Sequence, residues 1–143
     1  MPTVEDETTP SPPGRGAVLA DHALRVVGGV IAVIGGVMSA VLELLLSTVR
    51  VGGHLVGVSV LVAVGANIAL SWFAHEAVGS RWAVALPAVP WFVLMTAASI
   101  RTDEGDLLLA GGWVGLAMIV AGAMTFTVMA FRQILAPPTP SRY

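Results

Sequence analysis

Glu43 is the one acidic residue inside a long apolar run of this chain, and it is the first candidate for chemistry. If that run crosses a membrane, a carboxylate within it is costly and by default indicates a site that binds a proton or a ligand. Because Glu43 lies about one helical turn from the end of its run, its side chain could instead reach the interface and pair with Arg50 or His54. A contact with another subunit is a third interpretation.

Asn67 and two prolines interrupt the other apolar runs. Asn67 is the only asparagine, and a polar amide in apolar surroundings needs hydrogen-bond partners, so we expect it to bond to a neighbouring helix or to contact a substrate. Pro87 and Pro90 each lack a backbone donor and crowd the carbonyl four residues earlier, at Ala83 and Leu86, which predicts a kink. A carbonyl freed in this way is one partner that Asn67 could use.

Small residues recur at four-residue spacing, which places them on one face of a helix. Lipid gives no hydrophobic force between helices, so close backbone contact through small residues is the usual means of association in a membrane. Such faces could pack inside one bundle or bind another chain, and three of them in so small a protein favour at least one external partner. The residues concerned are Gly28, Ala32, Gly36 and Ala40; Gly53 and Gly57; and Gly111 and Gly115.

The apolar runs that carry these residues are each long enough to cross a bilayer. The hydrocarbon core is about 30 Å thick, so a spanning helix needs roughly 20 apolar residues. We therefore predict an all-α membrane protein, with four transmembrane helices in an up-down-up-down antiparallel bundle because the connecting turns are short. The predicted helices are residues 24–46, 55–73, 82–100 and 107–131, in a transmembrane domain of residues 22–133 between disordered tails, one acidic and proline-rich (1–21) and one proline-rich (134–143).

Composition agrees with a membrane protein and excludes several kinds of site. The mean hydropathy is +0.86 and 11% of the residues are charged, which is unlike an ordinary soluble domain. The absence of cysteine excludes disulfides and thiolate-bound metals. The net charge of -2 gives no sign of a nucleic-acid partner. Since the sequence has no catalytic cluster, cofactor motif or metal-ligand spacing, we expect no catalytic, cofactor-binding or metal site.

The arginines predict the orientation of the chain. An even number of spans puts both termini on one side, and the positive-inside rule assigns arginine-rich short loops to the cytoplasm. More arginines fall on the terminal side than on the other, so we expect both termini in the cytoplasm and a location in the cell membrane. The terminal group is Arg15, Arg25, Arg81, Arg132 and Arg142, and the opposite group is Arg50 and Arg101.

Two short motifs in the second half of the chain give a family resemblance. Glu104-Gly105-Asp106-Leu107 is followed by Gly112-Trp113-Val114-Gly115, after a helix that contains Pro-Trp. In this the chain resembles small four-helix integral membrane proteins of high-GC actinobacteria, mainly over residues 82–131. The resemblance implies the same fold and a membrane location, but no catalytic residue and no established function. Small multidrug exporters also have four helices and a glutamate in the first, but theirs lies near mid-membrane, unlike Glu43.

Three hypotheses for function follow. The first is a non-catalytic accessory or assembly subunit of a larger membrane complex, of respiratory or cell-envelope type, that binds other membrane subunits through the small-residue faces. The alternative is a small oligomeric proton-linked transporter or flippase that uses Glu43 and Asn67. An enzyme is the weakest hypothesis, because membrane enzymes cluster polar residues at one depth. The expected partners are the lipid bilayer and either other subunits or further copies of the chain.

Overall fold

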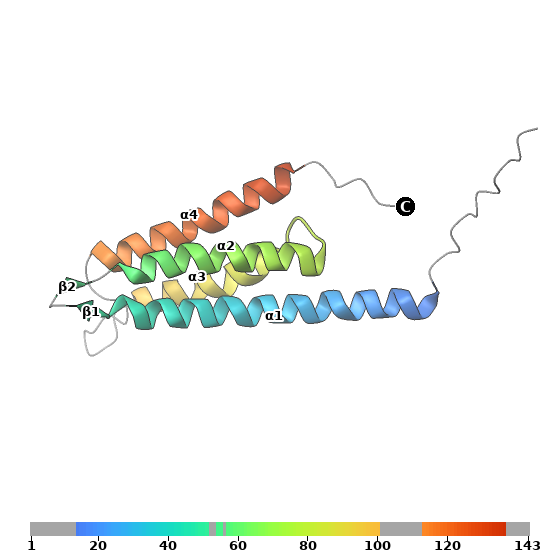
Figure 1. Cartoon of the computed structure of the whole chain (residues 1–143), viewed down its shortest axis with the longest axis horizontal. Helices are drawn as coiled ribbons and strands as arrows, with labels where there is room; N and C mark the ends of the chain where they lie inside the picture. The colour runs from blue at the N-terminus through green and yellow to red at the C-terminus, as the bar shows by residue number, and fades with distance from the viewer. Residues whose placement is uncertain (1–13, 52–53, 56, 101–112, 137–143) are drawn as a thin grey trace, which may run out of the picture.

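The described part of the chain is almost entirely helical. The computed structural model describes residues 14–51, 54–55, 57–100 and 113–136, and within the hairpin residues 50, 51, 54 and 55 it describes the backbone alone. These residues form four α-helices and one antiparallel hairpin (Figure 1). The helices are α1 (Arg15–Ser47), α2 (Val58–Val78), α3 (Ala85–Ser99) and α4 (Trp113–Leu135), and the strands are β1 (Arg50–Val51) and β2 (His54–Leu55).

Three of the helices, α1, α2 and α4, are long and apolar enough to cross a membrane. The helix α3 is also apolar but has 15 residues. At 1.5 Å per residue it is about 22 Å long, less than the roughly 30 Å of the hydrocarbon core. The predicted third span, residues 82–100, is therefore shorter than expected. Its first residues form a turn, in which the Ala85 N–H donates to the Trp82 carbonyl at 3.0 Å.

The first two helices begin at other residues than predicted. Residues 15–21, predicted as part of a disordered tail, are the first turns of α1. Gly14 is the N-cap of this helix, and the alanines and leucine that follow it favour a helix. In contrast, α2 begins only at Val58, because the apolar Leu55, the first residue of the predicted span, belongs to the strand β2. Hydrophobicity alone therefore could not place either boundary.

The two prolines lie at different places in α3. Pro87 lies in the first turn of the helix, where a missing N–H costs no helical hydrogen bond. The Ala83 carbonyl, which Pro87 was expected to free, accepts the Leu86 N–H at 3.0 Å. A missing donor therefore gives no reason for a kink at Pro87, and the kink itself stays a prediction. Pro90 does lie inside the helix, where it cannot donate to the Leu86 carbonyl.

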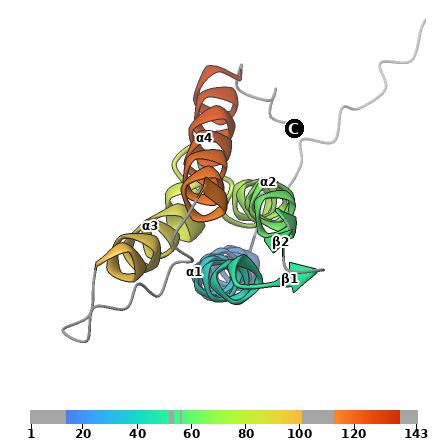
Figure 2. The ribbon, with the colours of Figure 1, turned by 90° about the vertical axis from the view of Figure 1, so that its left-hand side faces the viewer.

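One face of α1 joins the bundle through small residues. Its buried small residues are Gly28, Ala32, Gly36 and Ala40. A Cβ atom added to Gly28 would lie 2.7 Å from the Cβ of Ala77 in α2, and one added to Gly36 would lie 2.8 Å from the Cα of Pro87 in α3. Figure 2, which looks along the helices, shows α1 beside both of these helices. The stripe thus packs against the rest of this chain and is not free to bind another one.

The other two small-residue faces are described in part. Gly115 is buried in α4. Gly57, just before α2, is half-buried, and a Cβ there would lie 3.8 Å from the ring of Trp113. Gly53 and Gly111 lie outside the described residues. The described members of these faces therefore lie in or beside the interior of the bundle.

The helix α1 extends beyond its neighbours. Its 33 residues span about 50 Å, and its first part projects past the ends of α2 and α3 (Figure 1). Every residue from 15 to 27 is exposed, whereas the buried residues of α1 all follow from Gly28 on. We refer to residues 15–27 as the α1 overhang and to residues 28–47 as the α1 core segment.

Candidate functional site

Glu43 lies in the interior of the bundle and is 0% exposed. Its Oε1 accepts a hydrogen bond from Ser39 Oγ at 2.7 Å, and its Oε2 accepts one from Trp91 Nε1 at 2.9 Å. Of the three interpretations of Glu43, a side chain that extends along α1 to the interface does not agree with this burial, because the carboxylate reaches across to α3. The side chains of Arg50 and His54, its expected partners, lie outside the described part of the structure.

Trp91 is held in place by close contacts between helices. Gly36 lets the backbone of α3 approach α1 at Pro87, about one turn before Trp91. Gly122 of α4 leaves room for the Trp91 side chain, since a Cβ on it would lie 2.6 Å from Cη2 of that ring. The ring also packs edge-on against Phe126, with the centroids 5.6 Å apart. These contacts leave little freedom for the indole, and its N–H stays directed at Glu43.

Asn67 joins the same group from α2. Its Oδ1 lies 3.4 Å from Ser39 Oγ, and the whole side chain is buried. Among the described residues its Nδ2 has no hydrogen-bond partner, and it lies close to Gly122, 3.2 Å from where a Cβ would stand. The predicted bond to a carbonyl freed by the prolines is not found within the described ranges. We refer to Ser39, Glu43, Asn67 and Trp91 as the polar cluster.

The polar cluster can hold its hydrogen bonds in two proton states. Ser39 has one hydroxyl proton but faces two acceptors, Glu43 Oε1 and Asn67 Oδ1. If Glu43 is protonated, its O–H donates to Ser39, whose own proton then goes to Asn67. If Glu43 is ionised, half a turn of the Asn67 amide lets Nδ2 donate to Ser39, whose proton then goes to the carboxylate. The cluster can therefore take up and release a proton without losing a hydrogen bond to Ser39.

Further buried polar groups continue from the cluster along α2 and α4. Ser71 Oγ donates to the main-chain carbonyl of Asn67 at 2.7 Å, and Gln133 Nε2 donates to the main-chain carbonyl of Ser71 at 2.9 Å. Gln133 Oε1 and Ser59 Oγ are buried and have no partner in the part of the chain that the structure describes. An unsatisfied buried polar atom costs about 1–3 kcal/mol.

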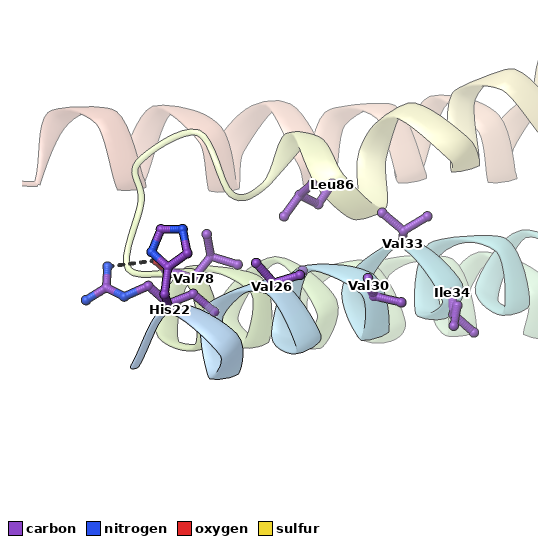
Figure 3. Close-up of a pocket in the computed structure, with 9 residues that line it drawn as sticks. His22, Val26, Val30, Val33, Ile34, Val78 and Leu86 are labelled. Atoms are coloured by element: carbon purple, nitrogen blue, oxygen red, sulfur yellow. Dashed lines mark hydrogen bonds between the residues drawn. The ribbon is translucent and has the colours of Figure 1, made fainter. Parts of the chain in front are cut away.

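An apolar groove of about 560 Å³ lies on the outer surface, away from the polar cluster. Figure 3 labels the residues His22, Val26, Val30, Val33, Ile34, Val78 and Leu86 along it. Arg25, at the same end as His22, is already engaged: its Nε pairs with Asp21 at 2.9 Å and its Nη1 donates to the Val78 carbonyl at 3.2 Å. Since its walls are aliphatic and its arginine is paired, the groove suits a lipid chain better than a polar substrate.

No family model, curated protein or solved structure matches this chain. Its resemblance to actinobacterial membrane proteins therefore stays a prediction, and function has to be argued from the site itself. Within the described ranges, no three histidine, aspartate or glutamate side chains come together in a way that could hold a metal ion. The polar cluster is therefore the candidate functional site.

The sequence pointed to half of this cluster. It singled out Glu43 and Asn67, which the structure links through Ser39. Ser39 was missed, although its position four residues before Glu43 places the two on one helix face. Trp91 was missed as a partner of Glu43, and the 48 residues between them carry no signal of their contact.

Proposed function

We propose that this chain is a small proton-linked transporter of the cell membrane, in which Glu43 is the carboxyl group that binds the proton. The observation that carries this proposal is the polar cluster, where a fully buried glutamate bridges α1 and α3 beside an amide of α2. Carboxylates of this kind inside membrane-spanning segments are typical of proton relays in pumps and transporters.

The bridge gives a physical route from proton binding to helix movement. A carboxylate accepts a stronger and shorter hydrogen bond from an N–H than a neutral carboxyl group does. Protonation of Glu43 therefore weakens its bond to Trp91, one of the contacts that hold α3 against α1. In the proposed cycle, α3 moves relative to α1 when Glu43 gains a proton and returns when the proton leaves.

In this proposal the four helices alternate in direction across the membrane and both termini face the cytoplasm. The antiparallel β1–β2 hairpin supports a reversal of the chain between α1 and α2. Gly79, with a φ of +68°, ends α2 and begins the short return to α3. The exposed Trp72 and Trp82 flank this return, as expected of an interfacial belt. The short helix α3 is accommodated by local thinning of the bilayer.

The test measures the separation of α1 and α3 as a function of pH. The chain has no cysteine, so Met38→Cys and Val93→Cys, both at exposed positions, provide a single pair of spin labels for double electron–electron resonance in nanodiscs. We expect the distance distribution to shift between neutral and acidic buffer. Glu43→Gln, a neutral mimic of the protonated acid, abolishes the shift, and Glu76→Gln, at an exposed glutamate, keeps it. One distribution at every pH would disprove the proposal.

A second function, a subunit of a larger membrane complex, is supported by the α1 overhang. The described small-residue faces no longer favour it, because they are used within this chain. The overhang, in contrast, carries large apolar side chains that are exposed, among them Val18, Leu19 and Leu24. Exposed apolar patches of this kind mark contacts with a protein or a membrane. Native purification in nanodiscs followed by mass spectrometry tests this function, and recovery of the chain alone contradicts it.

A further inference from the structure

Buried polar side chains form a series that is longer than the polar cluster. Its members are Ser39, Glu43 and Ser47 of α1, Ser59, Asn67 and Ser71 of α2, and Gln133 of α4. All of them are buried, in helices that are long and apolar enough to cross a membrane. We refer to these seven residues as the polar line. On α2 its members are spaced by four or eight residues, so they share one face of the helix.

The pairing of α1 with α2 places the members of the polar line in order. Gly28 packs against Ala77, and Ser39 lies beside Asn67, so α1 and α2 are antiparallel. Continuing this pairing by two turns brings Ser47 opposite Ser59. Glu43, one turn from both Ser39 and Ser47, then fills the level between Ser59 and Asn67, where α2 itself carries an alanine.

The polar line runs lengthwise through much of the bundle. From Ser59 to Ser71 the helix rises about 18 Å, more than half of a hydrocarbon core of roughly 30 Å. Gln133 continues it on α4 through its bond to the Ser71 carbonyl at 2.9 Å. The line therefore has one end near the hairpin and the other near the end of α4, with Glu43 between them.

Three atoms along this line point to a ligand. Ser59 Oγ, Asn67 Nδ2 and Gln133 Oε1 are buried and, among the residues that the structure describes, lack a hydrogen-bond partner. They lie near one end, at the middle and at the other end of the line. Buried polar atoms that find no protein partner are commonly satisfied by internal water, which makes two to four hydrogen bonds of its own. Hydroxyl and amide groups both donate and accept, so they suit a chain of waters.

We propose that the polar line holds a file of water molecules through which protons reach Glu43 from one end of the bundle and leave it toward the other end. This inference rests on the proposed function, because it names the route by which the proton-binding carboxyl exchanges its proton. A proton passes from water to the Glu43 carboxylate on one side. It leaves the carboxyl group to water on the other side, so that proton number is conserved.

The experiment uses the single asparagine of the chain. Isotope labelling of asparagine side chains in the full chain, in lipid bilayers, gives one side-chain amide signal, that of Asn67. Water-edited solid-state NMR then measures magnetisation passed to this signal from mobile water. We expect clear transfer, although the side chain is 0% exposed. Absence of transfer to a signal that the ordinary spectrum shows would overturn the inference.

Variants of the line test the route. Ser59→Val combined with Gln133→Leu replaces a polar group at each end, and we expect loss of the transfer from water to Asn67. Thr127→Val, which removes an exposed hydroxyl of α4, leaves the transfer unchanged. Unchanged transfer in the double variant would overturn the route. If the double variant gives no folded spectrum, Gln133→Leu alone decides: reduced transfer supports the route and equal transfer overturns it.

The two proposals can fail separately. Transfer from water to Asn67, together with a pH-independent separation of α1 and α3, supports the water file and contradicts the transporter. No transfer to Asn67, together with a pH-dependent separation, contradicts the water file and supports Glu43 as a proton-binding group.

Discussion

The two parts of α1 have the same secondary structure and similar apolar content, but they differ in what they contact. In the α1 overhang, valine and leucine side chains at five positions from 18 to 27 are between 54% and 71% exposed. In the α1 core segment, the buried residues are small or polar: glycine, alanine, serine and Glu43. Hydrophobicity therefore does not decide which part is buried. The buried part is the one whose small residues admit a neighbouring backbone and whose polar residues find hydrogen-bond partners. This is expected where lipid competes for apolar surfaces.

The largest effect that this comparison predicts comes from glycines in the two parts. Gly36→Ala adds a Cβ that would lie 2.8 Å from the Cα of Pro87, so α1 and α3 must move apart. We expect a loss of about 1–3 kcal/mol in the free energy of unfolding, in the range of overpacked cores. Reversible unfolding of the purified protein in mixed micelles measures this value.

The control is Gly16→Ala in the α1 overhang. A Cβ on Gly16 would meet nothing within 4 Å. Since alanine favours a helix over glycine, this change should leave stability unchanged or raise it by about 0.5–1 kcal/mol. Equal destabilisation by the two substitutions would show that the two parts of α1 do not differ in packing.

An effect of similar size is expected within the α1 core segment, at the bond between Trp91 and Glu43. Trp91→Phe removes the indole N–H and leaves Glu43 Oε2 without its donor. We expect a loss of about 1–3 kcal/mol for an unsatisfied buried acceptor. In a Glu43→Gln background the loss should be smaller, because a neutral acceptor forms the weaker bond. A double-mutant cycle of unfolding free energies measures the difference.

Trp82→Phe is the matched control for this cycle. Trp82 is 72% exposed at the return from α2 to α3, and within the described residues it is not part of the polar cluster. Its substitution should change stability by no more than about 0.5 kcal/mol, as is usual for surface positions. Additive effects of Trp91→Phe and Glu43→Gln would contradict the bridge between α1 and α3.

Much of the fold was predictable, because apolar runs near the thickness of a bilayer leave few other structures. The four helices follow from such runs, but their ends do not. The hairpin residues Val51 and Leu55 are apolar like α2. The helix α1 continues back to Arg15, and its first turns include an arginine, two alanines and a leucine, which are good helix formers. The length of α3 depended on a turn at residues 81–84, which has no distinct composition.

The candidate site was less predictable, because its geometry depends on contacts between distant residues. Glu43 and Asn67 are rare residue types in apolar runs, so they could be singled out. Glu43 accepts its bond from Trp91, and the position of Trp91 depends on Gly36, which admits the backbone of α3, and on Gly122, which leaves room for the indole ring. A sequence gives the identity of each small residue but not the neighbour that it admits.

The smallest effect on stability is predicted for the α1 overhang, where it separates the two candidate functions. Leu19→Ser and Leu24→Ser replace side chains that are 71% and 70% exposed and have no packing role in the bundle. We expect the unfolding free energy to stay within about 0.5 kcal/mol of the unsubstituted value.

If a partner subunit binds the overhang, however, the same two substitutions release it, and mass spectrometry of natively purified protein shows its loss. Leu61→Ser, at a 75% exposed position of α2 within a span, controls for the loss of apolar surface elsewhere. If the partner stays bound to the overhang variants but is lost from Gly115→Leu, the partner binds a small-residue face and not the overhang. A chain that purifies alone in every variant leaves the proton-linked polar cluster as the function to pursue.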